Sequence, residues 1–361
     1  MIPFARTPAV LVHMVRSPTS AQASASPSDG RDINRVSALL ELGLERVGPA
    51  PAECESIRLD PGTYQVCTGR PAMGTVVSVV ALHSSGAGAE DAIEAAFGEM
   101  DRLIGILSRY DSSSPVAHLN TAGQLRDAPP ELAEVVDRAL RYHRLTLGAF
   151  DVTVQPLVDL LAAAGGEPTL AERAAAAELV GAQNLRLSGR RLSFARSGLG
   201  VTLDGIAKGY IVDRMSDVLT RRGICRFLIN AGGDIRASGG RDDGRPWTIG
   251  VRDPARPDEL CDVVSLTDGA VATSGNYERP FRHIIDAATG WPAEGSTSVS
   301  VSAPDALAAD ALATALFVLG PAAGRWLARS IPGCECLILD DRGRPVGSPG
   351  WRSVGAKAGG A

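Results

Sequence analysis

An acid and a hydroxyl group stand four residues apart in one of the most apolar stretches of the chain. Residues 308–319 read AADALATALFVL, and only Asp310 and Thr314 are polar there. A helix of this composition is buried on nearly all sides, and a spacing of four places both side chains on one face. A buried carboxylate needs a cation, hydrogen-bond donors or a proton. Oxygen ligands suit Mg²⁺; the alternative is an acid that caps a loop, beside a threonine bonded to its own helix.

A second group, residues 201–210, reads VTLDGIAKGY and predicts a strand that breaks at Asp204-Gly205 before a helix begins. Unpaired N–H groups at the start of a helix attract phosphate, and Lys208 would add a positive charge. The Walker A pattern is absent from the sequence. These residues indicate a phosphate-binding turn, and an ordinary turn with a surface lysine remains the alternative.

Glycine-rich loops form a third group. Residues 231–234 read AGGD, and paired glycines permit either a tight hairpin turn or the close approach of a ligand. Residues 272–279 read ATSGNYER, and HIID follows at 283–286. Small hydroxyl side chains suit a phosphate or a flavin ring, and His283 can transfer a proton near neutral pH. A structural histidine between strands is the alternative.

The composition argues against several classes of function. The 361 residues carry a net charge of −5 and only 4% aromatic side chains, so nucleic acid is not an expected partner. The six cysteines include no C-x-x-C pair, which argues against a zinc or iron–sulfur site. No stretch reaches the roughly 18 apolar residues of a membrane-spanning helix, so no integral membrane span is expected. No G-x-G-x-x-G follows a strand, which argues against a nicotinamide site.

The N-terminal residues resemble a targeting segment. Arg6 precedes an apolar stretch at 8–15, and Ala21-Gln-Ala23 resembles a cleavage site. The apolar stretch is short and includes His13. A weak secretory signal and a disordered leader therefore remain as alternatives for residues 1–30.

The strands and helices that must position these groups alternate without a regular βαβ pattern. This order of elements predicts an α+β fold. Ser114-Pro115 predicts the cap of a short helix, and Gly320-Pro321 the end of a long one. The expected helices are 36–44, 93–107, 132–147, a segment from 206 onward, and 307–319. The expected strands are 73–82, 185–187, 192–194, 201–203, 227–230, one at Ile235, 247–251, 263–266, 299–302 and 336–339.

Eight segments occur in the order typical of the ApbE family, the FAD:protein FMN transferases, and the chain resembles that family over roughly residues 70–320. One such motif is weak, whereas eight in order are highly specific. They are Met73-Gly-Thr75, Ser108-Arg-Tyr110, Gly148-Ala-Phe-Asp-Val-Thr153, Gly205-Ile-Ala-Lys-Gly-Tyr210, Gly232-Gly-Asp234, Thr273-Ser-Gly275, His283-Ile-Ile-Asp286 and Asp310-Ala-Leu-Ala-Thr314.

The resemblance implies an α+β, ApbE-like (T-fold-like) domain of two lobes, with mixed or antiparallel sheets, packed helices and FAD between the lobes. The expected divisions of the chain are a leader (1–30), an N-terminal extension (31–68), the flavin transferase domain (69–345) and a C-terminal tail (346–361).

The resemblance also implies roles for single residues. Mg²⁺ would be held by the side chains of Asp310 and Thr314 and by the main-chain oxygen of Ala207. His283 would be the catalytic base. Asp204 departs from the family's usual Gly, Asn or Ser, and it is expected to face ribityl or adenosine hydroxyls rather than the pyrophosphate. The residues expected to contact FAD are Met73, Tyr110, Ala149, Phe150, Asp151, Asp204, Lys208, Gly233, Thr273, Ser274 and Ile284.

The implied reaction is the Mg²⁺-dependent transfer of the FMN half of FAD to a threonine hydroxyl of an acceptor flavoprotein, a redox subunit, with release of AMP. FAD is then a substrate and Mg²⁺ the cofactor. The alternatives are an FAD pyrophosphatase and a non-catalytic flavin-binding protein. The resemblance implies a periplasmic or membrane-associated location, and a cytoplasmic one follows if the N-terminal signal is not functional.

Overall fold

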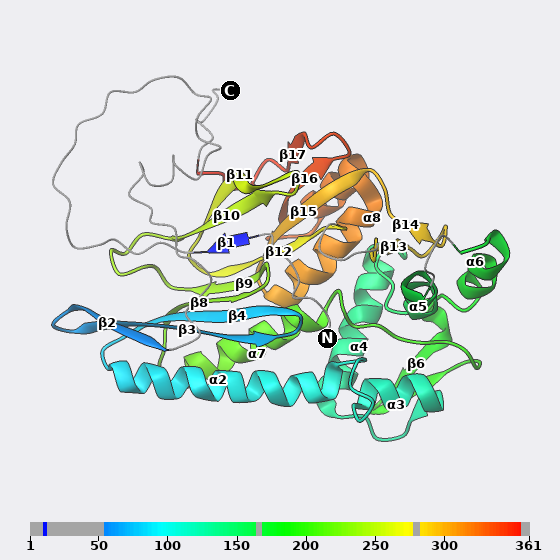
Figure 1. The fold of residues 1–361 in the computed structure, drawn as a ribbon, viewed down its shortest axis with the longest axis horizontal. Helices are drawn as coiled ribbons and strands as arrows, with labels where there is room; N and C mark the ends of the chain where they lie inside the picture. Colours follow the sequence, from blue (N-terminus) through cyan, green and yellow to red (C-terminus); the bar gives the residue numbers. More distant parts are fainter. Residues whose placement is uncertain (1–9, 13–53, 164–167, 277–281, 355–361) are drawn as a thin grey trace.

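A nine-stranded sheet forms the centre of the structure, a computed structural model that describes residues 10–12, 54–163, 168–276 and 282–354 (Figure 1). Its strand order is β17-β16-β15-β12-β9-β8-β4-β3-β2, and all strand pairings in the described ranges are antiparallel. Helices alternate with these strands, which confirms the α+β fold. The nine strands are β2 (Glu55–Asp60), β3 (Thr63–Ala72), β4 (Thr75–His83), β8 (Arg226–Ala231), β9 (Asp234–Ser238), β12 (Gly269–Ser274), β15 (Ser296–Ala303), β16 (Glu335–Asp340) and β17 (Pro345–Gly347).

Helices cover one face of this sheet, and a smaller sheet covers the other (Figure 1). The helices are α2 (Gly86–Leu107), α7 (Ala207–Arg221) and α8 (Ala306–Ser330). The smaller sheet consists of β10 (Trp247–Asp253) and β11 (Arg256–Leu266), with β1 (Val10–Val12) paired to β10. The long sheet is therefore the middle layer of three.

Alternation along β4 explains why the middle sheet is apolar on both faces. Val77 and Val79 belong to the core under the helices, whereas Val80 and Leu82 belong to the core under β10 and β11. Successive side chains of a strand point to opposite faces. The valine-rich stretch that predicted a strand therefore contributes to two cores at once.

A second, mainly helical group of elements lies beside the sheet (Figure 1). Its parts are α3 (Pro115–Ala122), α4 (Pro130–Leu145), α5 (Gln155–Ala163), α6 (Leu170–Ala177), a 3₁₀ turn (Ala182–Asn184) and the short strands β5 (Gln124–Leu125), β6 (Leu185–Ser188), β7 (Arg191–Phe194), β13 (Ile285–Asp286) and β14 (Trp291–Pro292). This group supplies one wall of the cavity described below.

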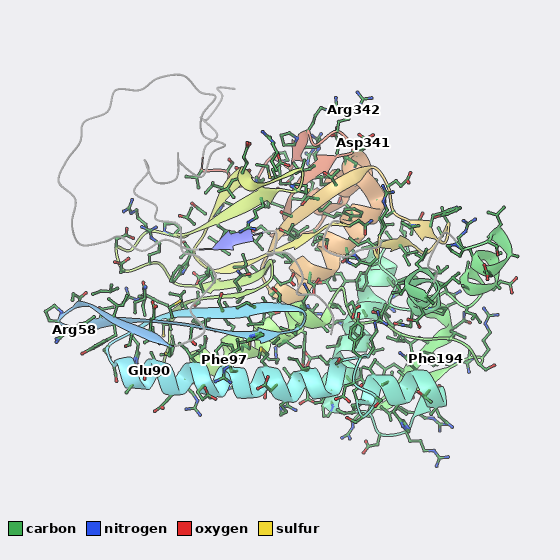
Figure 2. All side chains as sticks on the ribbon, in the orientation of Figure 1. Arg58, Glu90, Phe97, Phe194, Asp341 and Arg342 are labelled. Atoms are coloured by element: carbon green, nitrogen blue, oxygen red, sulfur yellow. The ribbon has the colours of Figure 1, made fainter. Side chains whose placement is uncertain are left out.

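Serine side chains cap two helices: α2, which begins at Gly86 rather than at the expected residue 93, and α3, whose Ser114 cap was expected. Ser85 Oγ accepts a hydrogen bond from Gly88 N, 3.1 Å away, and Ser114 Oγ accepts one from Ala117 N, 3.0 Å away. These bonds satisfy N–H groups that have no partner inside the helix. The amphipathic pattern of α2 is confirmed: Phe97 is buried against the core while Glu90 is exposed, as the labels in Figure 2 locate them.

α8 is the long apolar helix, and it has a break in the middle. The predicted stop is seen at Gly320, where φ is 73° and ψ is 178°. A second helical segment then begins with Pro321, a residue suited to a helix start, and continues to Ser330. In length and composition α8 could cross a membrane, yet 67% of its most apolar window is buried inside the domain. It is the only such helix in the described part of the chain.

One predicted strand is wrong. Residues 201–203 form no ladder, because their backbone groups bind elsewhere: Val201 N donates to Asn120 Oδ1 (2.8 Å) and Val201 O accepts from Asn120 Nδ2 (2.9 Å). Thr202 N donates to the carbonyl oxygen of Val152 (2.8 Å). These residues are thus held by the Asn120 side chain and the Val152 carbonyl rather than by a neighbouring strand.

Two of the expected domain boundaries fall inside strands of the nine-stranded sheet. The division between residues 68 and 69 falls inside β3, and that between 345 and 346 falls inside β17. Three residues of the expected leader, 10–12, form β1. The rest of the leader, the expected helix 36–44 and the end of the tail lie outside the described residues.

Candidate functional site

A cavity lies between the sheet and the mainly helical group. Eleven of the predicted site residues line it: Ala149, Phe150, Asp151, Asp204, Lys208, Thr273, Ser274, His283, Ile284, Asp310 and Thr314. They come from the loop before α5, the start of α7, the end of β12, the segment before β13 and the second and third turns of α8, so the fold gathers residues from five separate parts of the chain.

Oxygen atoms from α8 and β12 lie close together in the lining of the cavity. Asp310 is only 4% exposed, and its Oδ2 accepts a hydrogen bond from Gly209 N at 3.0 Å. Thr314 Oγ1 lies 3.4 Å from Ser274 Oγ. A methyl group on Gly205 would lie 2.9 Å from Thr314 Oγ1, so glycine keeps this oxygen accessible from the α7 side. A carboxylate with two hydroxyls is a donor set that fits Mg²⁺.

A buried ion pair places a positive charge in the same cavity. Lys208 Nζ lies 2.7 Å from Asp234 Oδ2, and the Asp234 side chain is almost fully buried. Asp234 begins β9 directly after a two-residue hairpin in which Gly232 and Gly233 have φ of 70° and 112°. Gly233 N donates to Asn230 Oδ1 at 3.0 Å. The glycines therefore make the tight turn that presents Asp234, and Gly233 itself does not line the cavity.

Asp151 holds one wall of the cavity together. Its Oδ1 accepts hydrogen bonds from Thr153 N (2.7 Å) and Thr153 Oγ1 (2.6 Å), and its Oδ2 accepts one from Ala182 N (3.1 Å). His143 Nδ1 lies 3.4 Å from the same carboxylate. These contacts tie the loop before α5 to the end of α4 and to the 3₁₀ turn.

Tyr110 stands at the rim and is anchored through Asp204. Its ring is 66% exposed, its hydroxyl donates to Asp204 Oδ2 at 2.8 Å, and the Arg109 guanidinium stacks on it at 4.3 Å from the ring centroid. Arg109 Nε also lies 3.4 Å from Asp204 Oδ2. Asp204 thus has a cation beside it, and it faces Tyr110 and Arg109.

His283 lines the cavity and is half-buried. The segment before it, residues 277–281, lies outside the described residues and includes Glu278 and Arg279 of the ATSGNYER motif. Asn276 joins the two ends of that segment, because its Oδ1 accepts a hydrogen bond from Ile284 N at 2.9 Å. The histidine therefore directly precedes an anchored position of the backbone.

Met73, Tyr110, Ala207 and Gly233 do not belong to the cavity lining. Met73 has a φ of 51° in the turn between β3 and β4, and Ala207 is the first residue of α7, next to Lys208. The described residues contain no cluster of three or more His, Cys, Asp or Glu side chains, so a metal here would be held by one carboxylate with hydroxyl and main-chain oxygens.

Sequence reasoning assigned no role to Asp234, Arg109 and Asn276. Asp234 could have been recognised, since it follows two glycines at the end of a strand and carries the charge opposite to Lys208. Arg109 and Asn276 gave no such signal. Their partners Asp204 and Ile284 are 95 and 8 residues away, and the intervening fold brings them together.

Known proteins are similar to this chain in sequence and in fold. The sequence profile of the ApbE family matches residues 73–338. The FAD:protein FMN transferase of Vibrio cholerae is 33% identical over 299 residues, which cover 77% of this chain and 89% of the relative. That of Escherichia coli K12 is 31% identical over 236 residues, which cover 60% and 67%.

Solved structures agree. Flavin transferase ApbE from Vibrio cholerae aligns with a TM-score of 0.71 at 29% identity, over 82% of this chain and 98% of that one. The ApbE protein from Thermotoga maritima aligns with a TM-score of 0.72 at 32% identity, over 82% and 97%. The extent of these matches confirms the resemblance, and the chain belongs to the ApbE family.

Proposed function

We propose that this protein is an FAD:protein FMN transferase that moves the FMN half of FAD onto a threonine hydroxyl of an acceptor protein and releases AMP. One observation carries the proposal: a single cavity joins Asp310, Thr314 and Lys208, which suit a pyrophosphate and its metal, with His283, which suits proton transfer. The printed names of the relatives support the same activity.

The oxygen-rich part of the cavity lining would hold the metal. The side chains of Asp310 and Thr314 and the main-chain oxygen of Ala207 are the proposed ligands of Mg²⁺. When bound, Mg²⁺ would neutralise the pyrophosphate and make AMP a better leaving group. Lys208 would place a positive charge beside the same phosphates, and its pairing with the buried Asp234 holds that charge in position.

The remaining residues would orient FAD and move one proton. Phe150 and Ile284 offer apolar surface to a ring system, Thr273 and Ser274 offer hydroxyls, and Tyr110 offers an exposed ring at the rim. A bond forms between the threonine oxygen and the phosphorus of FMN, while the bond from that phosphorus to the AMP oxygen breaks. His283 takes the hydroxyl proton, and AMP leaves with the electron pair.

Asp310→Ala tests this site directly. The variant should lose Mg²⁺-dependent FAD turnover by a hundredfold or more, because the carboxylate is the only charged ligand proposed. Turnover is measured as AMP release by chromatography, with a candidate acceptor carrying the target threonine present. Asp341→Ala, which removes an exposed acid that does not line the cavity, is the matched control (Figure 2). Full activity of Asp310→Ala would show that the metal site is wrong.

Experiments with and without an acceptor protein distinguish the transfer of FMN from the hydrolysis of FAD. With an acceptor, mass spectrometry should find FMN bound covalently to a threonine. Without one, the enzyme should release little FMN and AMP. Rapid multiple-turnover release of FMN and AMP without an acceptor would instead support an FAD pyrophosphatase, in which water replaces the threonine.

A further inference from the structure

α7 and α8, the two helices that carry the proposed metal ligands, touch backbone to backbone where they begin. A methyl group on Gly209 would lie 2.2 Å from the carbonyl oxygen of Ala306 and 2.8 Å from Leu307 Cα. No side chain fits at such a distance, so glycine is needed for this crossing. The contact lies two residues after Ala207 and four residues before Asp310.

Each helix uses a carboxylate to bind N–H groups at the start of the other. Asp310 of α8 accepts from Gly209 N of α7 at 3.0 Å. Asp213 of α7 accepts from Ala306 N and Leu307 N of α8, both at 2.9 Å. The first N–H groups of a helix have no partner within it and carry partial positive charge. These reciprocal caps thus fasten the two helix starts to each other.

The two caps differ in their relation to the cavity. Asp310 lines it, whereas Asp213 lines a second, polar cavity that shares no lining residue with the first, and Arg236 approaches Asp213 there at 3.9 Å. Asp213 therefore cannot touch a ligand of the first cavity. It contacts the turn of α8 that directly precedes Asp310, and a displacement of that turn would move Asp310 and Thr314 relative to α7.

We propose that Asp213 is a positioning residue for the metal site: by capping α8 it sets the separation between Ala207 on α7 and the Asp310 and Thr314 oxygens on α8. The inference rests on the proposed metal ligands. Groups that support metal ligands from outside typically change metal affinity 10- to 100-fold when they are removed. Loss of this cap should act on Mg²⁺ binding rather than on the flavin-facing residues.

Asp213→Asn and Asp217→Asn form a matched pair. Both residues lie on α7 and line the second cavity, and each change removes one negative charge. Asp217 pairs with Arg214 at 3.2 Å, and its carboxylate is not a cap of α8. Asparagine at 213 can accept only one of the two N–H groups and turns its own NH₂ toward the other. A general effect of charge would appear in both variants.

Mg²⁺ alone is titrated into the full-length proteins by calorimetry, and the half-saturating Mg²⁺ concentration for FAD turnover is measured in parallel. Asp213→Asn should weaken Mg²⁺ binding about tenfold, with Asp217→Asn within twofold of wild type. Equal Mg²⁺ affinity in Asp213→Asn and wild type, or an equal loss in Asp217→Asn, would overturn the proposal. Wild-type protein that binds no Mg²⁺ would overturn the metal site itself, and the role of Asp213 with it.

A second variant covers the case in which Asp213→Asn does not fold. Asp213→Glu keeps the charge and both oxygens but adds one methylene, which pushes the start of α8 away from α7. It should fold with wild-type circular dichroism and bind Mg²⁺ at least threefold more weakly. Wild-type Mg²⁺ affinity in Asp213→Glu would show that the spacing set by this cap does not matter to the metal.

Discussion

Acids in the cavity wall have donors or cations beside them, which allows the cavity to accept an anionic substrate. Asp234 pairs with Lys208, and Asp204 lies beside Arg109. Asp151 accepts N–H and O–H hydrogen bonds from its own loop. Opposite charges and donors at this range stabilise a buried carboxylate. The acids therefore need not repel a pyrophosphate.

His283→Gln tests the proposed base. Glutamine retains hydrogen-bonding capacity but cannot take up a proton, so the rate of transfer to the acceptor should fall by about 10² or more. FAD affinity, measured by flavin fluorescence, should stay within twofold of wild type. An unchanged transfer rate would assign His283 a structural role.

The backbone conformation of Leu147 should lower the free energy of unfolding. Its φ is 53°, in the left-handed region, although its side chain is 95% exposed and gains little from packing. Such a conformation costs a non-glycine residue about 1 kcal/mol. Leu147→Gly should raise the free energy of unfolding in urea by roughly 0.5 kcal/mol, after the greater flexibility of the unfolded chain is allowed for.

The exposed Leu170 is the control for this change, because it begins α6 with regular helical backbone. Leu170→Gly should lower the free energy of unfolding by about 0.5–1 kcal/mol. A loss of stability in both variants would show that the backbone at Leu147 is not strained.

At the scale of elements, the crossing of α7 and α8 contains a buried acid with a perturbed titration. Burial, as the main cause, raises the pKa of Asp213 to about 6, against the lowering effect of the Ala306 and Leu307 N–H groups. Asp305 raises the pKa further and Arg236 lowers it. The other charged groups that line the same cavity are Glu134, Arg138, Arg214 and Asp217.

This pKa predicts the sign of a pH effect. The native state holds the proton more tightly than the unfolded state, so the contribution of Asp213 to stability is present at low pH and is lost as pH rises through about 6. Relative to Asp213→Asn, the wild type should gain up to ~3 kcal/mol in free energy of unfolding between pH 7 and pH 4. Urea denaturation at both pH values measures the difference, and a constant difference would exclude a raised pKa.

At the scale of the whole molecule, a ligand in the cavity would bridge the sheet and the mainly helical group. FAD with Mg²⁺ should therefore stabilise the fold. At 100 times its dissociation constant a ligand adds about 2.7 kcal/mol, which corresponds to a rise in melting temperature of roughly 4 °C for a chain of this length. Differential scanning fluorimetry should show a smaller Mg²⁺-dependent rise for Asp310→Ala. No rise in wild type would argue against FAD as the ligand.

Local patterns in the sequence were sufficient for most elements and for much of the site. The apolar spacing of α2, the Ser114 cap of α3 and the valine-rich stretch of β4 all depend on neighbours within a few residues, where backbone geometry decides the outcome. The pairing of Asp310 with Thr314 on one face of α8 is of the same kind. These features could be predicted because they need no knowledge of the rest of the molecule.

Other features depended on contacts between distant parts of the chain. Residues 201–203 have the composition of a strand, yet Asn120 occupies the backbone groups that a neighbouring strand would use. This tertiary contact outweighs the local preference for a strand. At Gly320 the expected helix end is seen, and only the second helical segment that begins at Pro321 was not expected.

The sequence by itself therefore determined which chemical groups the protein has: an acid and a hydroxyl on a buried helix, a lysine after a turn, a histidine beside a glycine-rich loop. Only the tertiary structure decided what each group faces. Lys208 meets Asp234, Asp204 meets Tyr110, and Asp213 caps the helix that carries Asp310. The reason is physical: helix geometry brings residues four apart together, whereas contacts between residues 26 to 94 positions apart form only when the layers pack.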